Sequence, residues 1–157
     1  MNYIIREMKE TEYSLLEDFL YEAIFVPEGV DPPPRPIVNA PELQVYTRDF
    51  GAQKHDKALA AEVDNKVIGA VWVRIMNDYG HIDDDTPSFA ISLYKEYRGF
   101  GIGTEMMKEM LAILKTSGYK QASLAVQKAN YAVKMYRSVG FGTIDENEEE
   151  YIMVTRL

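Results

Sequence analysis

The sequence predicts a single α+β domain with an α/β/α-like arrangement, in which about four helices flank a mixed, mostly antiparallel twisted sheet of about seven strands. Residues 58–63 and 67–76 have strand character and are joined by the turn sequence Asp64-Asn65-Lys66, which indicates a hairpin. Farther along, a strand, a glycine-rich loop, a helix and a second strand predict a crossover connection between parallel strands. The length of 157 residues fits one domain.

The first third of the chain is predicted to contain one strand and two helices. Residues 3–6 are predicted to form the first strand, and the apolar spacing over residues 10–25 is helical. The next stretch, VPEGVDPPPRPIVNAP, holds most of the prolines, which exclude a regular helix, so a long ordered loop is expected. A short helix is expected over residues 41–50, with Pro41 in its first turn.

The second half supplies the rest of the sheet. A strand over residues 88–94 leads through the glycine loop into a helix that stops near Gly118. After it we expect a strand at 121–126, a helix at 131–139 ending at Gly140, and two closing strands at 141–144 and 151–156 around an acidic turn.

Composition excludes several classes of protein. There are no cysteines, so disulfides, thiolate nucleophiles and zinc–thiolate sites are absent, and a cytoplasmic location is the simplest expectation. The formal net charge of -8 disfavours nucleic acid as a partner. No apolar run reaches membrane-spanning length, so no membrane association is expected. The segment HIDDD matches no metal-ligand spacing, and no metal is predicted.

The stretch YRGFGIGTEMM, residues 97–107, is the strongest candidate for a binding site. A helix start has unpaired backbone N–H groups and partial positive charge, and glycines there allow a phosphate to approach. The spacing is wrong for a P-loop and for the dinucleotide fingerprint G-x-G-x-x-G. The candidate phosphate-binding residues are Arg98, Gly99, Phe100, Gly101, Ile102, Gly103 and Thr104.

The pattern Arg98-x-x-Gly101-x-Gly103 resembles the pyrophosphate loop of the Gcn5-related N-acetyltransferase (GNAT) family. A second segment, NYAVKMYRSVGF, resembles the later part of the same family's core. Its matching positions are Asn130, Ala132, Tyr136, Gly140 and Phe141. The resemblance implies the acyl-CoA N-acyltransferase type of fold, and the order of elements agrees with it over the whole chain. Lys95 departs from the proline that the family often has after this strand.

The resemblance implies that acetyl-CoA binds where the strands at 89–94 and 121–126 splay apart. Main-chain groups of Leu93, and also of Ile91, would then bind the pantetheine arm, and the Leu93 N–H would polarise the thioester carbonyl. Asn130 would add a side-chain amide, while its alternative role is a helix cap. Tyr136 matches the family's general acid, which protonates the departing thiolate; the alternative is an ordinary inward-facing aromatic residue.

The implied reaction is direct transfer of an acetyl group to the primary amine of a small molecule or peptide. The strand before the glycine loop has no carboxylate, so the general base stays open among Asp83, Asp84, Asp85, His81 and water. Candidates for the acceptor side are Glu22, Glu28 and the proline-rich loop, whose acidic groups would suit a cationic amine. The alternative is an aromatic wall that would suit a less polar acceptor, formed by Tyr13, Tyr21, Phe25 and Tyr46. The acceptor itself, the use of larger acyl groups and the oligomeric state are not identified, although dimers are frequent in the family.

Two other interpretations compete with the enzyme. The same fold could hold an acyl-CoA as a catalytically silent sensor or regulatory module; Tyr136 favours the enzyme, and the missing strand carboxylate keeps the sensor open. An unrelated α+β domain with a fortuitous glycine loop would have to explain both segments at family spacing.

Overall fold

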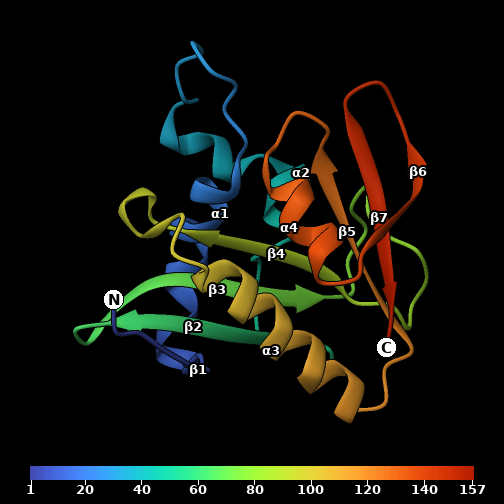
Figure 1. Cartoon of the computed structure of the whole chain (residues 1–157), viewed down its shortest axis with the longest axis horizontal. Helices are drawn as coiled ribbons and strands as arrows, with labels where there is room; N and C mark the ends of the chain where they lie inside the picture. Colours follow the sequence, from blue (N-terminus) through green and yellow to red (C-terminus); the bar gives the residue numbers. More distant parts are fainter.

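A computed structural model describes all 157 residues and contains one seven-stranded sheet, in the order β1-β2-β3-β4-β5-β7-β6 (Figure 1). The strands are β1 (Ile4–Glu7), β2 (Lys57–Val63), β3 (Lys66–Arg74), β4 (Ser88–Leu93), β5 (Gln121–Gln127), β6 (Gly142–Glu146) and β7 (Glu150–Arg156). The α-helices are α1 (Leu16–Ala23), α2 (Pro41–Gln44), α3 (Ile102–Thr116) and α4 (Ala132–Ser138). Every neighbouring pair is antiparallel except β4 and β5, so the predicted fold is confirmed.

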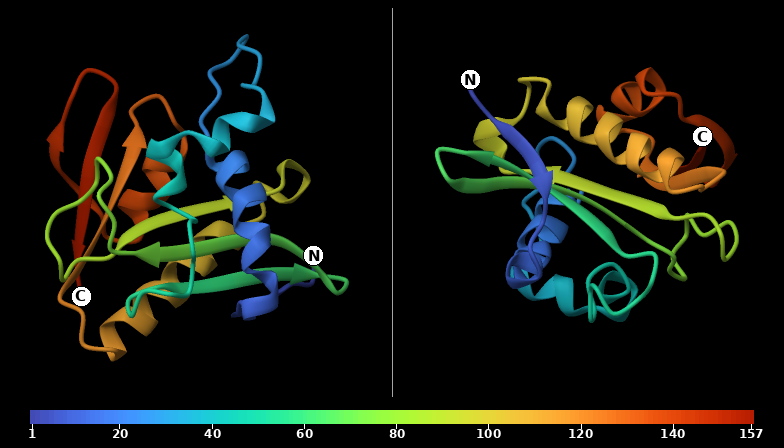
Figure 2. Two further views of the ribbon diagram at one scale, coloured as in Figure 1. Left: turned by 180° about the vertical axis from the view of Figure 1, so that it is seen from behind. Right: turned by 90° about the horizontal axis from the view of Figure 1, so that it is seen from below.

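Helices cover both faces of the sheet. Figure 2 shows α1 and the segment that contains α2 on one face, and α3 and α4 on the other. Side chains alternate along each strand, so each face has its own core. Trp72 packs with Phe19 of α1 on the first face, and Phe89 packs with Met106 and Met110 of α3 on the second. None of the helices is both long and apolar enough to cross a membrane.

Three predicted helix and loop assignments in the first third need correction. The helix expected over residues 10–25 begins as a 3-10 helix at Glu10–Leu15, where Glu12 Oε1 accepts the Lys9 backbone N–H at 2.8 Å, and its α-helical part ends at Ala23. The proline-rich loop contains a 3-10 helix, Arg35–Asn39, since the fixed φ of proline is compatible with that turn. The helix expected over residues 41–50 has only one α-helical turn and continues as successive turns to Asp49, whose φ is 51°.

The two parallel strands in the middle of the sheet barely pair. Ser88 and Ser123 form the single registered residue pair between β4 and β5. Beyond that pair the strands point in different directions, as Figure 1 shows. β4 stays paired with β3 along its whole length, and β5 with β7. The sheet therefore opens between the C-terminal halves of β4 and β5.

Candidate functional site

The glycine loop follows β4 and enters α3 at the open edge of this gap. Gly99 and Gly101 have φ values of 84° and 83°, which L side chains rarely adopt. A Cβ built on either residue would meet no atom within 4 Å. These two glycines therefore serve the backbone conformation and leave the approach to the loop free.

Six consecutive backbone N–H groups, from Gly99 to Thr104, have no hydrogen-bond partner within the protein. The first helical bond of α3 runs from the Glu105 N–H to the Gly101 carbonyl at 3.2 Å. Ile102 is buried and anchors the helix start, whereas the Phe100 side chain is 56% exposed. The loop presents a row of donors at the positive end of a 15-residue helix.

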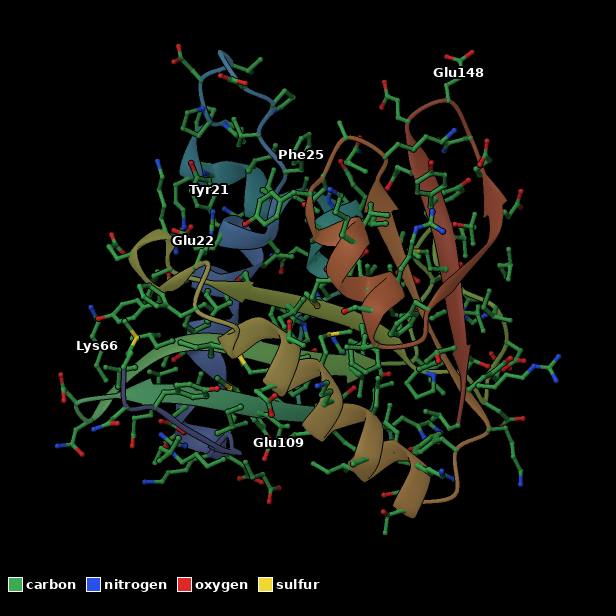
Figure 3. The ribbon with its side chains drawn as sticks, viewed as in Figure 1. Tyr21, Glu22, Phe25, Lys66, Glu109 and Glu148 are labelled. Carbon is green, nitrogen blue, oxygen red and sulfur yellow. The ribbon has the colours of Figure 1, made fainter.

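Arg98 is engaged by the protein on the other side of the loop. Its Nε donates to the Leu93 carbonyl at 3.0 Å, and its Nη2 donates to Glu22 Oε2 at 3.1 Å. Figure 3 shows Glu22 at the C-terminal end of α1, facing the segment that follows β4. The ion pair thus connects the glycine loop to the first helix. A contact of Arg98 with phosphate remains a prediction.

Backbone groups of β4 and β5 point into the gap. Tyr94 donates its N–H to the Ile68 carbonyl of β3 at 2.9 Å, and bonded and non-bonded pairs alternate along an antiparallel ladder. The main-chain groups of Ile91 and Leu93 therefore point away from β3, toward β5. By the same alternation, the bond from the Lys128 N–H to the Glu149 carbonyl directs the main chain of Ala125 toward β4.

Helix α4 and the turn before it line the gap from the β5 side. Asn130 Oδ1 accepts the Ala132 N–H at 2.9 Å in the turn before the helix, whose N-cap residue is Tyr131, and the side-chain NH₂ makes no hydrogen bond within the protein. The methyl group of Met135 and the side chains of Leu93 and Ile91 surround Gly103, where an added Cβ would lie 3.4 to 3.9 Å from them. Gly103 thus allows α3 to pack closely on β4.

Tyr136 lies on the inner side of α4, with its ring 6.2 Å from that of Phe141. The residue is half-buried, and its hydroxyl makes no hydrogen bond within the protein. Desolvation, with a smaller contribution from Tyr131, raises the pKa of the Tyr136 phenol to about 12. The hydroxyl is therefore protonated at neutral pH and has no competing acceptor.

A half-buried carboxylate lies on the opposite face of the sheet, beside the closed end of the gap. Tyr46 donates its hydroxyl to Asp78 Oδ2 at 3.2 Å, and Ser88 makes a longer contact of 3.4 Å with Oδ1. Ser88 Oγ also lies 3.1 Å from Ser123 Oγ, which joins Asp78 to the residue pair where the strands separate. Desolvation raises the pKa of Asp78, against the lowering effect of the hydrogen bond from Tyr46.

The residues predicted as possible bases lie farther along the same loop, before β4 begins. Asp83 Oδ1 accepts the Thr86 hydroxyl at 2.8 Å and the Asp85 N–H at 2.9 Å, so it organises a turn. The side chain of Asp84 is 98% exposed. His81 Nδ1 lies 3.0 Å from the Met76 carbonyl. None of these four groups makes a contact with Ser88 or Ser123.

Sequence reasoning missed Asp78 and Met135, and it considered Tyr46 only as part of an aromatic wall on the acceptor side. Asp78 shares its loop with three other aspartates. No local sequence pattern indicates that those three are exposed while Asp78 is half-buried. Tyr46 is one of 11 tyrosines, and its position depends on Trp72, whose indole N–H donates to the Tyr46 carbonyl at 3.1 Å. Met135 precedes the predicted Tyr136 directly, and that position beside a candidate residue is the signal that could have found it.

Solved structures share this architecture over the whole chain. A GNAT-family acetyltransferase from Streptococcus pneumoniae has a TM-score of 0.70 at 19% identity, with 99% of this chain and 100% of that chain covered. A PaiA N-acetyltransferase from Thermoplasma acidophilum in complex with coenzyme A has a TM-score of 0.72 at 20% identity, with both chains fully covered. The ribosomal-protein-S18-alanine N-acetyltransferase of Escherichia coli has a TM-score of 0.68 at 14% identity, with 99% and 94% covered.

The search of curated proteins found no match to the sequence. At these identities the solved structures show the fold alone. The family is shown by its sequence model, which matches residues 18–141 and so includes most of α1, the glycine loop, Asn130 and Tyr136. The protein belongs to the acetyltransferase (GNAT) family.

Proposed function

We propose that this protein is an N-acetyltransferase that moves the acetyl group of acetyl-CoA to a primary amine by direct attack within a ternary complex. The observation that carries the proposal is the row of six unpaired N–H groups from Gly99 to Thr104 beside an open strand pair. A diphosphate bonded to these groups would satisfy the donors and meet the positive end of α3.

The residues around the gap fit the rest of coenzyme A. The pantetheine arm carries amides, which pair with main-chain groups as an additional strand would. Ile91 and Leu93 offer such groups from β4, and Ala125 offers them from β5. The side-chain amide of Asn130 is a further donor beside the same path. When bound, the cofactor supplies an activated acetyl thioester.

Three tasks then fall to the protein. The Leu93 N–H, directed into the gap, would stabilise negative charge on the carbonyl oxygen. Tyr136 would give its proton to the leaving sulfur, for which its neutral phenol is suited. The amine must lose a proton before it attacks, because an alkylamine with a pKa of roughly 10.4 is mostly protonated at pH 7.

The first test is calorimetric titration with acetyl-CoA and with coenzyme A. We expect the wild-type protein to bind both ligands, and Gly101→Val to lose binding because the branched side chain covers the donors. Gly118→Val is the matched control: Gly118 has a φ of 91°, open surroundings and a position at the far end of α3. The control should keep affinity, with thermal melts reporting the strain common to both variants.

The second test is release of coenzyme A thiol with a panel of amines: butylamine, 1,4-diaminobutane, free lysine and a peptide with N-terminal alanine. Transfer to any of them, with the acetylated amine identified by mass spectrometry, supports the proposed reaction. Tight binding of acetyl-CoA without transfer to a wide set of amines would instead indicate the silent acyl-CoA-binding module. Absence of binding would contradict both.

A further inference from the structure

We propose that Asp78, held by Tyr46 and Ser88, is the group that takes the proton from the attacking amine. This inference rests on the proposed acetyl transfer and assigns it a catalytic residue outside the positions that the sequence pattern indicated. The acceptor would approach from the face of the sheet that carries α1, opposite to α3.

The position of the carboxylate supports this role. Asp78 is bonded to Ser88, and Ser88 and Ser123 are the last registered pair before β4 and β5 separate. The main-chain groups proposed to hold the pantetheine arm begin three residues beyond Ser88, at Ile91, and the Leu93 N–H proposed for the thioester carbonyl follows two residues later. Asp78 therefore lies at the closed end of the gap, on the inner side of the proposed thioester, and the proton would pass from the amine to Asp78 through water.

Solvent reaches this face of the gap at two small side chains. Ala90 and Ala125 follow Ser88 and Ser123 by two residues, so they point to the same face as Ser88. Both are partly exposed although they belong to the two central strands. The loop that carries Asp78 lies beside them, because Gly80 of this loop packs against the main chain of Ala125.

The carboxylate is also held in a defined place without a counter-ion. Asp78 forms no ion pair, and Tyr46 is fixed in turn by the bond from Trp72 to its carbonyl. Three titratable groups surround Asp78: Tyr46, His81 and Glu150. The backbone N–H of His81 donates to the Asp78 carbonyl at 3.2 Å. The charge of Glu150 in β7 adds to the burial that raises the pKa of Tyr46. An ammonium group would be the first cation to reach this site.

The proposed step is balanced in atoms and charge. The ammonium group gives one proton to the Asp78 carboxylate, and the neutral nitrogen attacks the thioester carbonyl. A C–N bond forms and the C–S bond breaks. The sulfur receives a proton from Tyr136, and the nitrogen releases its second proton to water as the amide forms. The products are the N-acetylated amine and coenzyme A thiol, and the two side chains exchange protons with solvent before the next turnover.

The test compares Asp78→Asn with Asp64→Asn, the same substitution at an exposed carboxylate in the turn between β2 and β3. With the best amine of the panel, we expect kcat/KM at pH 7 to fall about 100-fold or more for Asp78→Asn and to stay unchanged for Asp64→Asn. Calorimetry should show wild-type affinity for acetyl-CoA in both variants. Activity of Asp78→Asn should recover as pH rises and the amine deprotonates in solution.

A second comparison separates proton transfer from a structural effect. Ethylamine is charged at pH 7, whereas 2,2,2-trifluoroethylamine is similar in size and already neutral. Asp78→Asn should slow the acetylation of ethylamine much more than the acetylation of the fluorinated amine. Tyr46→Phe should move the acidic limb of the pH profile upward, because the hydrogen bond from Tyr46 lowers the pKa of Asp78.

If Asp78→Asn lowered kcat/KM equally for both amines, or left the pH profile unchanged, the assignment of Asp78 would be wrong. Acetyl transfer by the wild-type protein would still support the proposed function. If the wild-type protein binds acetyl-CoA but acetylates no amine, the proposed function and the role of Asp78 fail together. The two failures are therefore distinguishable.

Discussion

Tyr136 is the residue whose surroundings most clearly suit one chemical task. Its phenol is desolvated, its pKa is raised to about 12, and its hydroxyl has no partner in the protein. A group with this pKa keeps its proton across the whole range in which an amine becomes neutral. The same group would be a poor base, so the role that we propose for it in acetyl transfer is that of an acid.

We expect Tyr136→Phe to lower kcat by at least about tenfold with little change in the affinity for acetyl-CoA, because only the donated proton is lost. The wild-type rate should not decline up to about pH 10, since the phenol is still protonated there. Steady-state kinetics over this range checks both statements. Tyr131→Phe, at a tyrosine that is 72% exposed just before α4 begins, serves as the control and should keep full activity.

At this scale the sequence predicted the parts of the site that depend on backbone geometry. The glycines at 99 and 101 predict open space for a phosphate, and a Cβ on either would meet no atom within 4 Å, whereas their positive φ values were found only in the structure. The partners of Arg98 could not be predicted, because Glu22 lies 76 residues away in the chain. The partial burial of Asp78 likewise depends on Tyr46 and Ser88 from two other segments, which no local pattern reports.

Among the elements, β3 determines how well β4 holds its shape at the gap. Gly69 of β3 is paired with Leu93, and a Cβ at position 69 would come within 2.9 Å of Leu93 Cγ and 3.0 Å of the Ser92 carbonyl. The second contact is with backbone, so a side chain there would displace β4 itself. The geometry of the Leu93 main chain therefore depends on a glycine in the neighbouring strand.

We expect Gly69→Ala to weaken acetyl-CoA binding several-fold and to lower the melting temperature, because the strand that lines the gap must shift. An overpacked core position costs about 1–3 kcal/mol. Gly142→Ala in β6 is the control, since a Cβ there meets nothing within 4 Å. Unaltered affinity in Gly69→Ala, measured by calorimetry, would show that β4 tolerates the displacement.

Strands and long helices were the elements that the sequence predicted well, and short helices were not. The apolar stripe of α3 and the hairpin of β2 and β3 carry strong periodic signals, and the structure confirms them. The segment from Glu10 to Leu15 was predicted as the start of an α-helix but forms a 3-10 helix. Over six residues the periods of the two helix types differ too little for the apolar pattern to distinguish them.

For the molecule as a whole, two carboxyl groups change the stability with pH in opposite directions, because folding lowers the pKa of Glu12 and raises that of Asp78. Hydrogen bonds from Arg6, at 2.8 Å to each oxygen, lower the pKa of Glu12 to about 2. Its contribution to stability is therefore complete above its unfolded pKa of 4.5 and is lost as the pH falls toward 2. Asp78 has a raised pKa, so its ionisation reduces stability as the pH rises above 3.8.

We expect Glu12→Gln to lower the free energy of unfolding by about 1 kcal/mol at pH 7 and to have a progressively smaller effect as the pH falls toward 2. Asp78→Asn should leave stability at pH 7 unchanged or higher, because a desolvated charge is removed. Urea unfolding at several pH values measures both. Glu10→Gln, at an exposed residue without an ion pair, is the control. A loss of stability in Asp78→Asn would contradict the expected direction of the Asp78 effect.

The single residue pair between β4 and β5 has a consequence for how the molecule opens. Four strands lie on one side of this seam and three on the other, and their main chains are joined laterally only at Ser88 and Ser123. Cooperative unfolding units are bounded where backbone hydrogen bonds are few, so the natural boundary between two such units runs along the seam. A cofactor bound there would contact both halves and hold them together. Part of its binding free energy would therefore be added to the free energy of unfolding of the whole chain.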